Sequence, residues 1–411
     1  MKLVFPAALR PHGLYIAGNP GSGKTSLIQD LALRDIKAGR GVCVIDPTGD
    51  LVDRLVNWVP KSRVNDTIFF DSSDPVPIDF FSYHNNEDER QVLTDSLVAI
   101  FDLENAPRAR PYLRKILGTL FDFNDAGGQA TFLDILRFIE SETYRKEIWK
   151  KVPQREWKFF PKPIEFEAIS VRMITFQESK SLRTIFGAQS PKLNIWDIMQ
   201  EKKVFLVNLK DTPTDLFLGS LICAKFQQAT FRRRELKEAE RKPYYLYIDE
   251  CNTIMKYAAQ EFDAMLLRAR KYKLCLTMTN QIPSKLPTEI QDSLGTIGSL
   301  VLFNLDTKDG RIFKDKLNYY SPETLVNLEP FHAIARVGNQ VNRVKTATYL
   351  GFSPASYAPS IKNRTKTAYA CNTPQTCLNK GDGNNTASKT EEIQPGPAPD
   401  VPPHERKKKN A

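Results

Sequence analysis

The sequence has few residues that could form a zinc site. Its six cysteines form no C-x-x-C pair, and none of its four histidines lies near a cysteine at the spacing of metal ligands. Cys371 and Cys377 lie in a polar segment, whereas four others lie among apolar residues: Cys43, Cys223, Cys251 and Cys275. These four are expected to be buried, reduced thiols of a cytosolic protein, and no zinc site is expected.

Long apolar runs are also absent. No stretch reaches the roughly 18 apolar residues of a membrane-spanning helix, and the opening MKLVFP is too short for a secretory signal. The chain as given is expected neither to span a membrane nor to be secreted. Its 411 residues, 41% hydrophobic and 26% charged, fit a soluble globular protein of two or three domains. The net charge of +10 is a mild bias toward polyanions.

A glycine-rich motif lies near the start of the chain. The apolar residues 14–17 predict a buried strand, the next eight residues fit G-x-x-x-x-G-K-[ST], and a helical pattern follows. Strand, glycine loop and helix together predict a phosphate site, because backbone N–H groups and the positive end of the helix point at one place. Lys24 would reach the β- and γ-phosphates and Thr25 would bind Mg²⁺. The predicted nucleotide-binding residues are Gly18, Asn19, Pro20, Gly21, Ser22, Gly23, Lys24, Thr25 and Ser26.

A second motif ends an apolar strand with two acids. Residues 244–248 are apolar or aromatic and are followed by Asp249 and Glu250, as in a Walker B strand. Asp249 can hold Mg²⁺, and Glu250 can polarise the attacking water as a catalytic base. Residues 274–279 predict another strand, and the Asn280-Gln281 at its end would lie beside these carboxylates, facing the γ-phosphate.

The order of the predicted elements indicates an α/β fold. Strands at 14–17, 40–47 and 67–70 alternate with helices, as in a parallel sheet with crossover helices. Residues 87–200 show helical periodicity without a convincing strand, which predicts an all-α insertion domain. The alternation resumes with strands at 203–209 and 244–248, and further strands are expected at 299–304 and 331–337. The expected domains are 1–86 and 201–350, forming the nucleotide-binding domain, 87–200, the insertion, and 351–411, a disordered basic tail.

Residues 145–162 combine basic and aromatic side chains. Seven Lys/Arg and two Asp/Glu lie among Trp149, Trp157, Phe159 and Phe160. Such a segment suits contact with a nucleic-acid backbone, and a solvated helix end with aromatics in its own core is an equally good interpretation. The candidate DNA-binding residues are Lys150, Lys151, Arg155 and Lys158.

The segments GNPGSGKTS, GVCVIDPTGD, YLYIDE and RARKYKLCLTMTNQ, in this order, resemble the HerA/FtsK superfamily, with the TraG-like coupling ATPases of conjugation and type IV secretion as the best match. The resemblance covers roughly residues 10–350 and implies a RecA-like P-loop ATPase domain with a mostly parallel sheet plus an all-α insertion. It also implies ATP and Mg²⁺ as ligands, and an ATPase centre made of Lys24, Thr25, Asp249, Glu250 and Gln281. Arg270, beside Lys271, would act in trans on a neighbouring subunit's nucleotide in a ring, usually a homo-hexamer, that moves DNA without sequence preference.

The sequence departs from this family in two places. Typical coupling proteins carry N-terminal membrane helices, whereas here only 17 residues precede the phosphate loop. Either a membrane segment is missing or the protein works in the cytoplasm, at the inner face of the membrane through partners such as a relaxase and secretion-channel components. The second departure is Cys251, which follows Glu250 at a position that is often aromatic in relatives.

A viral DNA-packaging ATPase and a nucleotide-switched binding module stay open as alternatives. A small-molecule kinase is disfavoured, since it needs no such insertion and no arginine in trans.

Overall fold

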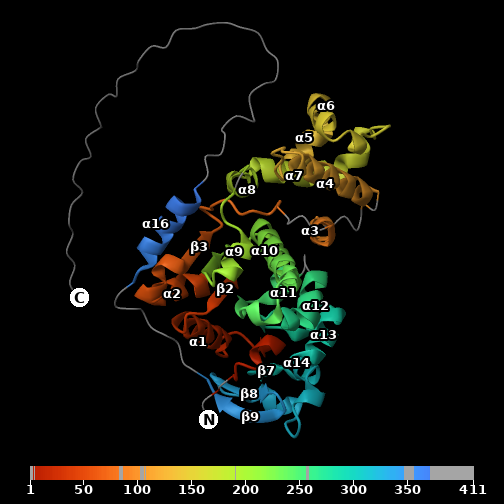
Figure 1. The fold of residues 1–411 in the computed structure, drawn as a ribbon. Coiled ribbons are helices and arrows are strands. Elements are labelled where there is room, and N and C mark those ends of the chain that lie inside the picture. The colour runs from red at the N-terminus through yellow and green to blue at the C-terminus, as the bar shows by residue number, and fades with distance from the viewer. Residues whose placement is uncertain are drawn as a thin grey trace, which may run out of the picture. The chain divides into compact units, whose positions relative to one another are not determined.

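The computed structural model describes residues 3, 5–82, 87–101, 106, 108–189, 191–255, 259–346 and 356–370. The described residues belong to one compact unit that extends to Thr373 (Figure 1). Residues 87–200, the predicted insertion, and the sheet belong to this same unit. The predicted division of the chain into domains therefore stays a prediction. None of the helices in the described ranges is both long and apolar enough to cross a membrane.

A nine-stranded sheet of order β3-β4-β2-β5-β6-β1-β7-β8-β9 forms the centre of the fold. The first seven strands along the chain are parallel to one another, whereas β8 and β9 add an antiparallel hairpin after β7. The strands are β1 (Leu14–Ala17), β2 (Gly41–Asp46), β3 (Thr67–Asp71), β4 (Val204–Asn208), β5 (Tyr244–Ile248), β6 (Leu274–Asn280), β7 (Ser299–Leu302), β8 (His332–Val337) and β9 (Gln340–Lys345). The eight predicted strands are confirmed, and β9 was not predicted.

Helices cover both faces of the sheet, which explains why the parallel strands are apolar at successive positions. Tyr15 packs into the cluster on one face and Ile16 into the cluster on the other. One face is covered by α1 (Lys24–Lys37), α2 (Asp50–Leu55) and α16 (Ala358–Tyr369). The other is covered by α10 (Pro213–Arg232), α11 (Cys251–Met255), α12 (Ala259–Arg268) and α13 (Thr288–Ser293). Two short helices, α14 (Thr307–Arg311) and α15 (Pro322–Val326), precede the hairpin.

The described residues between β3 and β4 are mainly helical, as the sequence indicated. They form α3 (Glu87–Ile100), α4 (Ala109–Asp125), α5 (Asp134–Glu140), α6 (Glu142–Lys151), α7 (Glu167–Glu178), α8 (Lys180–Phe186) and α9 (Ile195–Gln200). One isolated parallel bridge joins Ile78 to Leu193. Packed phenylalanines such as Phe101, Phe132 and Phe186 give these helices a core that continues into the cluster under the sheet.

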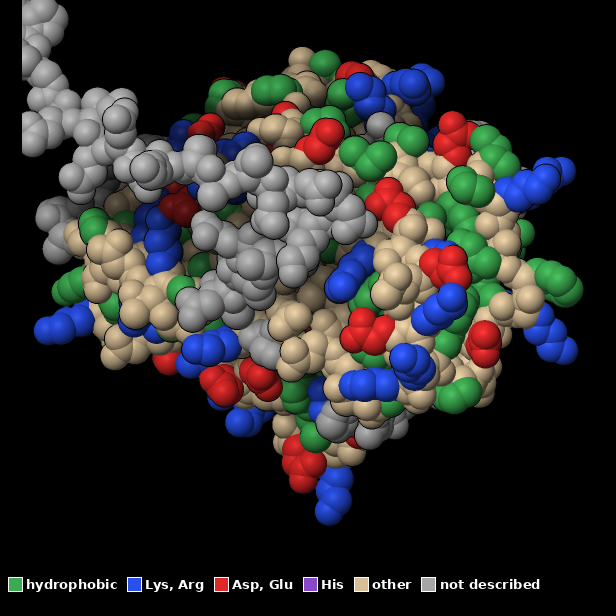
Figure 2. Space-filling view, turned by 90° about the horizontal axis from the view of Figure 1, so that it is seen from above, with side chains coloured by type: hydrophobic (Ala, Val, Ile, Leu, Met, Phe, Trp, Pro, Cys, Tyr) green, Lys and Arg blue, Asp and Glu red, His purple; other side chains and the backbone are tan. Residues whose placement is uncertain are grey.

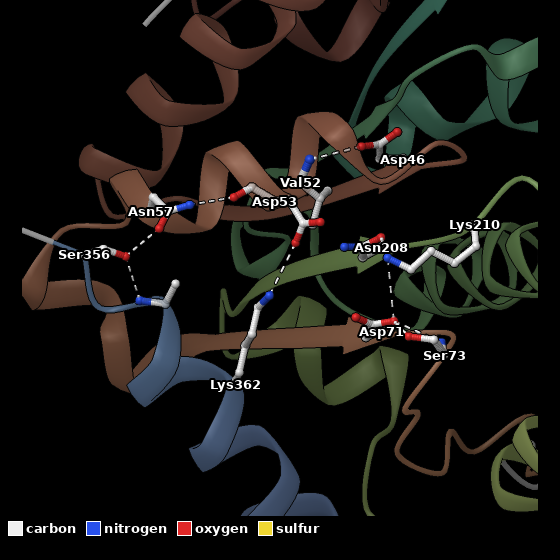
Figure 3. Close-up of polar contacts among 11 residues, drawn as sticks. Asp46, Val52, Asp53, Asn57, Asp71, Ser73, Asn208, Lys210, Ser356 and Lys362 are labelled. Carbon is white, nitrogen blue, oxygen red and sulfur yellow. Dashed lines mark hydrogen bonds and ion pairs between the residues drawn. The ribbon is translucent and has the colours of Figure 1, made fainter. Parts of the chain in front are cut away.

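The prediction that disorder begins at residue 351 is wrong for residues 358–369, which form α16. This helix covers the free edge of the sheet: the N–H of Phe69 in β3 donates to Thr365 Oγ1 at 3.1 Å, and Ile361 is fully buried. Lys362 forms an ion pair with Asp53 of α2 at 3.3 Å (Figure 3). These contacts stabilise a helix in a segment whose composition alone favours disorder. Residues 371–411, with Cys371 and Cys377, lie outside the described residues.

The other four cysteines, Cys43, Cys223, Cys251 and Cys275, are buried and free, as predicted.

Candidate nucleotide-binding site

The parallel register brings the two sequence motifs to one edge of the sheet. β1 lies beside β6, with Ala17 opposite Asn280, and β5 lies on the other side of β6, with Ile248 opposite Met278. The loop 18–23 after β1, the acids after β5 and Gln281 after β6 therefore leave the sheet at the same edge. In parallel α/β sheets, ligands bind at this carboxyl edge.

The phosphate loop has the backbone that an anion cradle requires. Gly21 and Gly23 adopt φ of 74° and 114°, which favour glycine. Gly23 is the N-cap of α1, so the first free N–H groups of a 14-residue helix point into the loop. Gly18 is also required, because a Cβ there would lie 2.6 Å from Phe303 Cβ. The loop and the helix dipole thus favour a bound phosphate.

Lys24 lies under this loop and faces the acids of β5. Its Nζ donates to Gly18 O at 2.7 Å and to Asn19 O at 3.3 Å, and lies 3.8 Å from Glu250 Oε1. Burial lowers the pKa of Lys24, and the nearby carboxylates of Glu250 and Asp249 oppose that shift. The ammonium therefore faces two carboxylates across the site, at the place where it could contact a triphosphate.

Asp249 and Glu250 are held differently. Asp249 is buried, and burial raises its pKa to about 6, although a hydrogen bond from Thr279 acts in the opposite direction. Glu250 follows in a positive-φ conformation (φ 40°), which is uncommon for a residue with a side chain and is often found at functional sites. Its N–H donates to Thr279 Oγ1 at 3.0 Å. Glu250 keeps more exposure than Asp249, as a base for an attacking water needs.

A third carboxylate, Asp46, lies at the end of the neighbouring strand β2. Its oxygens accept from the Thr48 N–H and hydroxyl, at 3.0 and 2.9 Å. They also accept from the Val52 N–H at 3.0 Å, as Figure 3 shows. It also adds to the raised pKa of Asp249. The sequence showed an acid at this strand end but assigned it no role. The structure makes Asp46 the residue that closes the β2–α2 turn beside the site.

Three predicted residues are placed at this edge by the backbone alone. Thr25 and Ser26 are the second and third residues of α1, next to Lys24. Gln281 directly follows β6, between the acids of β5 and the phosphate loop of β1. The roles of Thr25 as a Mg²⁺ ligand, of Ser26 as a nucleotide contact and of Gln281 as a γ-phosphate contact stay predictions.

Arg270 lies at the opposite edge of the sheet. It is exposed in a 3₁₀ turn, η8 (Ala269–Tyr272), that precedes β6, whereas the phosphate loop meets the other end of that strand. A seven-residue strand spans about 23 Å, more than an arginine side chain can bridge. Arg270 therefore does not belong to the phosphate site of its own chain.

The basic–aromatic segment 145–162 is divided by the structure. Trp157 is buried, and Trp149 and Phe160 pack against the core, so only Phe159 among the four aromatics is largely exposed. Arg155 forms an ion pair with Asp122, and Lys151 lies 5.2 Å from the Phe123 ring centroid and donates to Gly127 O at 3.3 Å. Lys150 and Lys158 are exposed. On the face of Figure 2, basic and acidic side chains are intermixed. Most of the segment thus fits the interpretation as a solvated helix end whose aromatic side chains pack in its own core.

No protein-family model matches the sequence, and no curated protein matches it. Solved structures do match the fold. The plasmid coupling protein TrwB in complex with ADP and Mg²⁺ matches with a TM-score of 0.65 and 17% identity, over 87% of this chain and 91% of that one. The chain has the fold of TrwB.

Two further structures agree. TrwB with the ATP analogue ADPNP has a TM-score of 0.65 and 18% identity, over 86% of this chain and 90% of that chain. VirB4 of Thermoanaerobacter pseudethanolicus has a TM-score of 0.57 and 16% identity, over 84% of this chain and 90% of that chain. The predicted fold class, an α/β RecA-like P-loop domain with a mostly parallel sheet, is thereby confirmed through the likeness to TrwB.

The residues of this site fit ATP with Mg²⁺. The loop 18–23 offers backbone donors, Lys24 offers a cation, and Asp249 with the hydroxyl of Thr25 offers the oxygen ligands that Mg²⁺ prefers. The sequence had not indicated three residues that contact the loop or the acids: Thr279, Asn304, whose carbonyl accepts from the Asn19 N–H, and Phe331, whose N–H donates to Ser22 O. Thr279 could have been suspected, because it is the last residue of a predicted strand that ends beside the acids. Asn304 and Phe331 also lie at the ends of predicted strands, but nothing in the local sequence links those ends to the phosphate loop.

Proposed function

We propose that the protein is an ATPase that works in a ring, with six subunits the expected number, and moves DNA during conjugation or type IV secretion. The observation that supports it best is the facing pair of Lys24 and Glu250, 3.8 Å apart, on a phosphate loop and an adjacent acidic strand end. The fold supports it as well, since TrwB, described as a plasmid coupling protein, was solved with ADP and Mg²⁺. A place in the cytoplasm, with a relaxase or channel component as partner, belongs to the same proposal.

The residues take the following roles in this proposal. The loop N–H groups and Lys24 bind the phosphates and stabilise the charge that develops on the γ-phosphate. Thr25 and Asp249 hold Mg²⁺, which neutralises phosphate charge when it is bound with ATP. Glu250 orients and deprotonates the attacking water, and Gln281 contacts the γ-phosphate beside it. Arg270 acts on the site of the next subunit.

Two substitutions test the chemistry. Lys24→Ala is expected to abolish ATP turnover, and Glu250→Gln is expected to bind ATP but lower the rate by about 10²–10⁴. Turnover should be measured with and without DNA, next to circular dichroism to show that each variant is folded. Stimulation by DNA supports a motor. Unstimulated turnover with nucleotide-dependent partner binding supports the switch module instead, and full activity of Lys24→Ala contradicts the site.

DNA contact by the insertion needs a separate test. Lys150 and Lys158 are exposed, whereas Arg155 is already paired with Asp122. Lys151 is exposed as well, but it already contacts Gly127 O and the Phe123 ring. If the two lysines bind phosphates, Lys150→Ala/Lys158→Ala lowers the salt dependence of binding by about 0.9 in log–log slope for each duplex phosphate that is no longer neutralised. The double variant Lys37→Ala/Lys61→Ala removes the same charge from exposed positions on the sheet domain and serves as the control. Equal slopes in the two double variants contradict DNA binding by Lys150 and Lys158.

A further inference from the structure

The phosphate loop is held at two places by segments that lie far from it in the sequence. We define Gly18 and Asn19 as its first shoulder, and Ser22 and Gly23 as its second. Between them, Pro20 and Gly21 are exposed, and a Cβ at Gly21 would meet no atom within 4 Å. The loop is therefore fixed at its ends and open in its middle, where a phosphate would sit.

Asn304 holds the first shoulder. It follows β7, the neighbour of β1, and its carbonyl accepts from the Asn19 N–H at 2.7 Å. Its side-chain Oδ1 also accepts from Asn19 Nδ2 at 2.7 Å, while its Nδ2 donates to the carbonyls of Val326 and Leu328. One side chain thus ties the loop to the end of α15. Gly18 is fixed on the other side, because its N–H donates to Asn280 O at 3.2 Å.

Phe331 holds the second shoulder from the start of β8. Its N–H donates to Ser22 O at 2.8 Å, and its ring lies so close to Gly23 that a Cβ there would be 2.9 Å from Phe331 Cδ1. Its own φ is 63°, a conformation that is rare for a bulky side chain and persists only where the surroundings enforce it. Here the Thr346 N–H, which donates to Phe331 O at 2.8 Å, keeps the residue in place.

We infer that Asn304 and Phe331 are positioning residues that hold the phosphate loop in the shape that receives a nucleoside triphosphate. A glycine-rich loop without these contacts loses conformational entropy when it closes on phosphate, and the contacts remove that loss before the ligand arrives. The inference rests on the proposed nucleotide site, since it names what positions that site. Both residues contact the loop, at Asn19, Ser22 and Gly23, and not the acids of β5 in the described structure, so the effect should fall on binding more than on the chemical step.

The side-chain bond can be tested from both ends. Asn304→Ala and Asn19→Ala each remove it, and each is expected to weaken binding of a non-hydrolysable ATP analogue about tenfold. For Asn304→Ala, which lies outside the loop, kcat should stay within about twofold of the parent. The double variant should bind no worse than the weaker single variant, because both remove the same bond. Asn363→Ala, an exposed asparagine of α16, is the control. Parent-like affinity of folded Asn304→Ala, or losses that multiply in the double variant, would overturn the role of Asn304.

Hydrogen exchange separates this inference from the proposed function, because it needs no nucleotide. In the full chain, amides of residues 18–23 should exchange faster in Asn304→Ala than in the parent, while those of Asn363→Ala should not. If exchange rises but the parent binds no ATP analogue, the proposed function fails and the positioning contact stands. If the parent binds the analogue and loop exchange is unchanged by Asn304→Ala, the contact does not position the loop.

Phe331→Gly gives an independent test. Glycine accepts φ of 63° without strain and keeps the N–H that bonds Ser22, so the variant removes the ring and leaves the backbone contact. Glycine also gives the unfolded chain more conformational freedom, which offsets the relief of strain in the folded state. Affinity for the ATP analogue should fall several-fold whichever of these two effects on the melting temperature is larger. A fall in melting temperature with unchanged affinity would show that the ring serves the fold and not the loop.

Discussion

The hydroxyl of Thr279 donates a hydrogen bond to Oδ1 of Asp249. The same hydroxyl accepts from the Glu250 N–H at 3.0 Å, so one fully buried threonine of β6 contacts both acids at the end of β5. The bond lowers the pKa of Asp249, against the burial that raises it to about 6. The neighbouring strand therefore decides how much of Asp249 is ionised near neutral pH, and with it the capacity of Asp249 to hold a metal ion.

Thr279→Val should shift the pH profile of ATP turnover. Without the hydroxyl, the pKa of Asp249 rises further above 6, so the acid limb of kcat/KM moves to higher pH and activity falls more on the acid side of neutrality than on the alkaline side. Thr279→Ser keeps the hydroxyl and should restore the parent profile. Superimposable profiles of the valine variant and the parent would show that Thr279 does not set the ionisation of Asp249.

Asp249→Asn should stabilise the fold while abolishing turnover. A carboxyl whose pKa is raised from 3.8 to about 6 on folding favours the folded state below pH 3.8, and that contribution is lost as the pH rises to 6. At about pH 8 the buried charge opposes folding by on the order of 3 kcal/mol, which the amide does not carry. Urea unfolding at that pH without Mg²⁺ or nucleotide should therefore show a higher midpoint for Asp249→Asn. A midpoint below that of the parent would contradict the argument.

The sequence predicted those parts of the fold and site that depend on local patterns. Residues 244–248 and 274–279 could be recognised as strands because parallel strands are apolar at successive positions, and both are confirmed. The phosphate loop could be recognised because its glycines are needed by its own backbone, as the positive φ of Gly21 and Gly23 shows. Such features require no knowledge of what lies opposite them.

The missed parts depend on contacts between distant segments. α16 has a single large aliphatic residue fully buried, Ile361, and forms because Thr365 accepts from the Phe69 N–H and Arg364 donates to Thr67 O at the edge of β3. β9 pairs only with β8 and has two buried residues, Val341 and Val344, too few to give a strong alternating pattern. Phe331 holds a loop about 300 positions away in sequence. No periodicity reports such pairings.

Thr365→Val should destabilise the protein through the sheet edge. Valine has nearly the same shape but cannot accept the Phe69 N–H, which would then be buried without its partner, at a cost of about 1–3 kcal/mol. Thr367→Val changes an exposed threonine of the same helix and serves as the control. The measurement is the free energy of unfolding in urea. If the two variants are equally stable, α16 does not protect the edge of β3.

The position of Arg270 favours a role outside its own subunit. Arg270 could instead pair with an acid of its own subunit, for instance Glu261 or Asp263 of α12. Asp263 accepts from Ser293, and the side chain of Glu261 lies outside the described part of the structure. Within the described residues Arg270 has no ion pair, and its charge acts on His12, whose pKa is lowered by burial and by Arg270. If the chain works in a ring, as proposed, an exposed arginine at the amino edge of the sheet, far from its own phosphate loop, is available to a neighbour.

Mixing two inactive variants tests this arrangement. If Arg270 completes the site of the next subunit, Arg270→Ala should lower ATP turnover by about 10³–10⁵, as removal of such arginines does, without weakening nucleotide binding to a comparable degree. Glu250→Gln subunits are inactive for a different reason, since they lack the base. In rings mixed at equal ratio, about a quarter of the interfaces join an intact Glu250 site to an intact Arg270, because head-to-tail contacts pair each site with one neighbour. Those interfaces should restore a matching fraction of parental activity.

Arg270→Lys serves as the control, because it keeps the charge but not the planar guanidinium and should complement poorly. If the variants assemble together and no mixture regains activity, Arg270 does not act across the interface, and the proposal of a ring with shared sites fails with it.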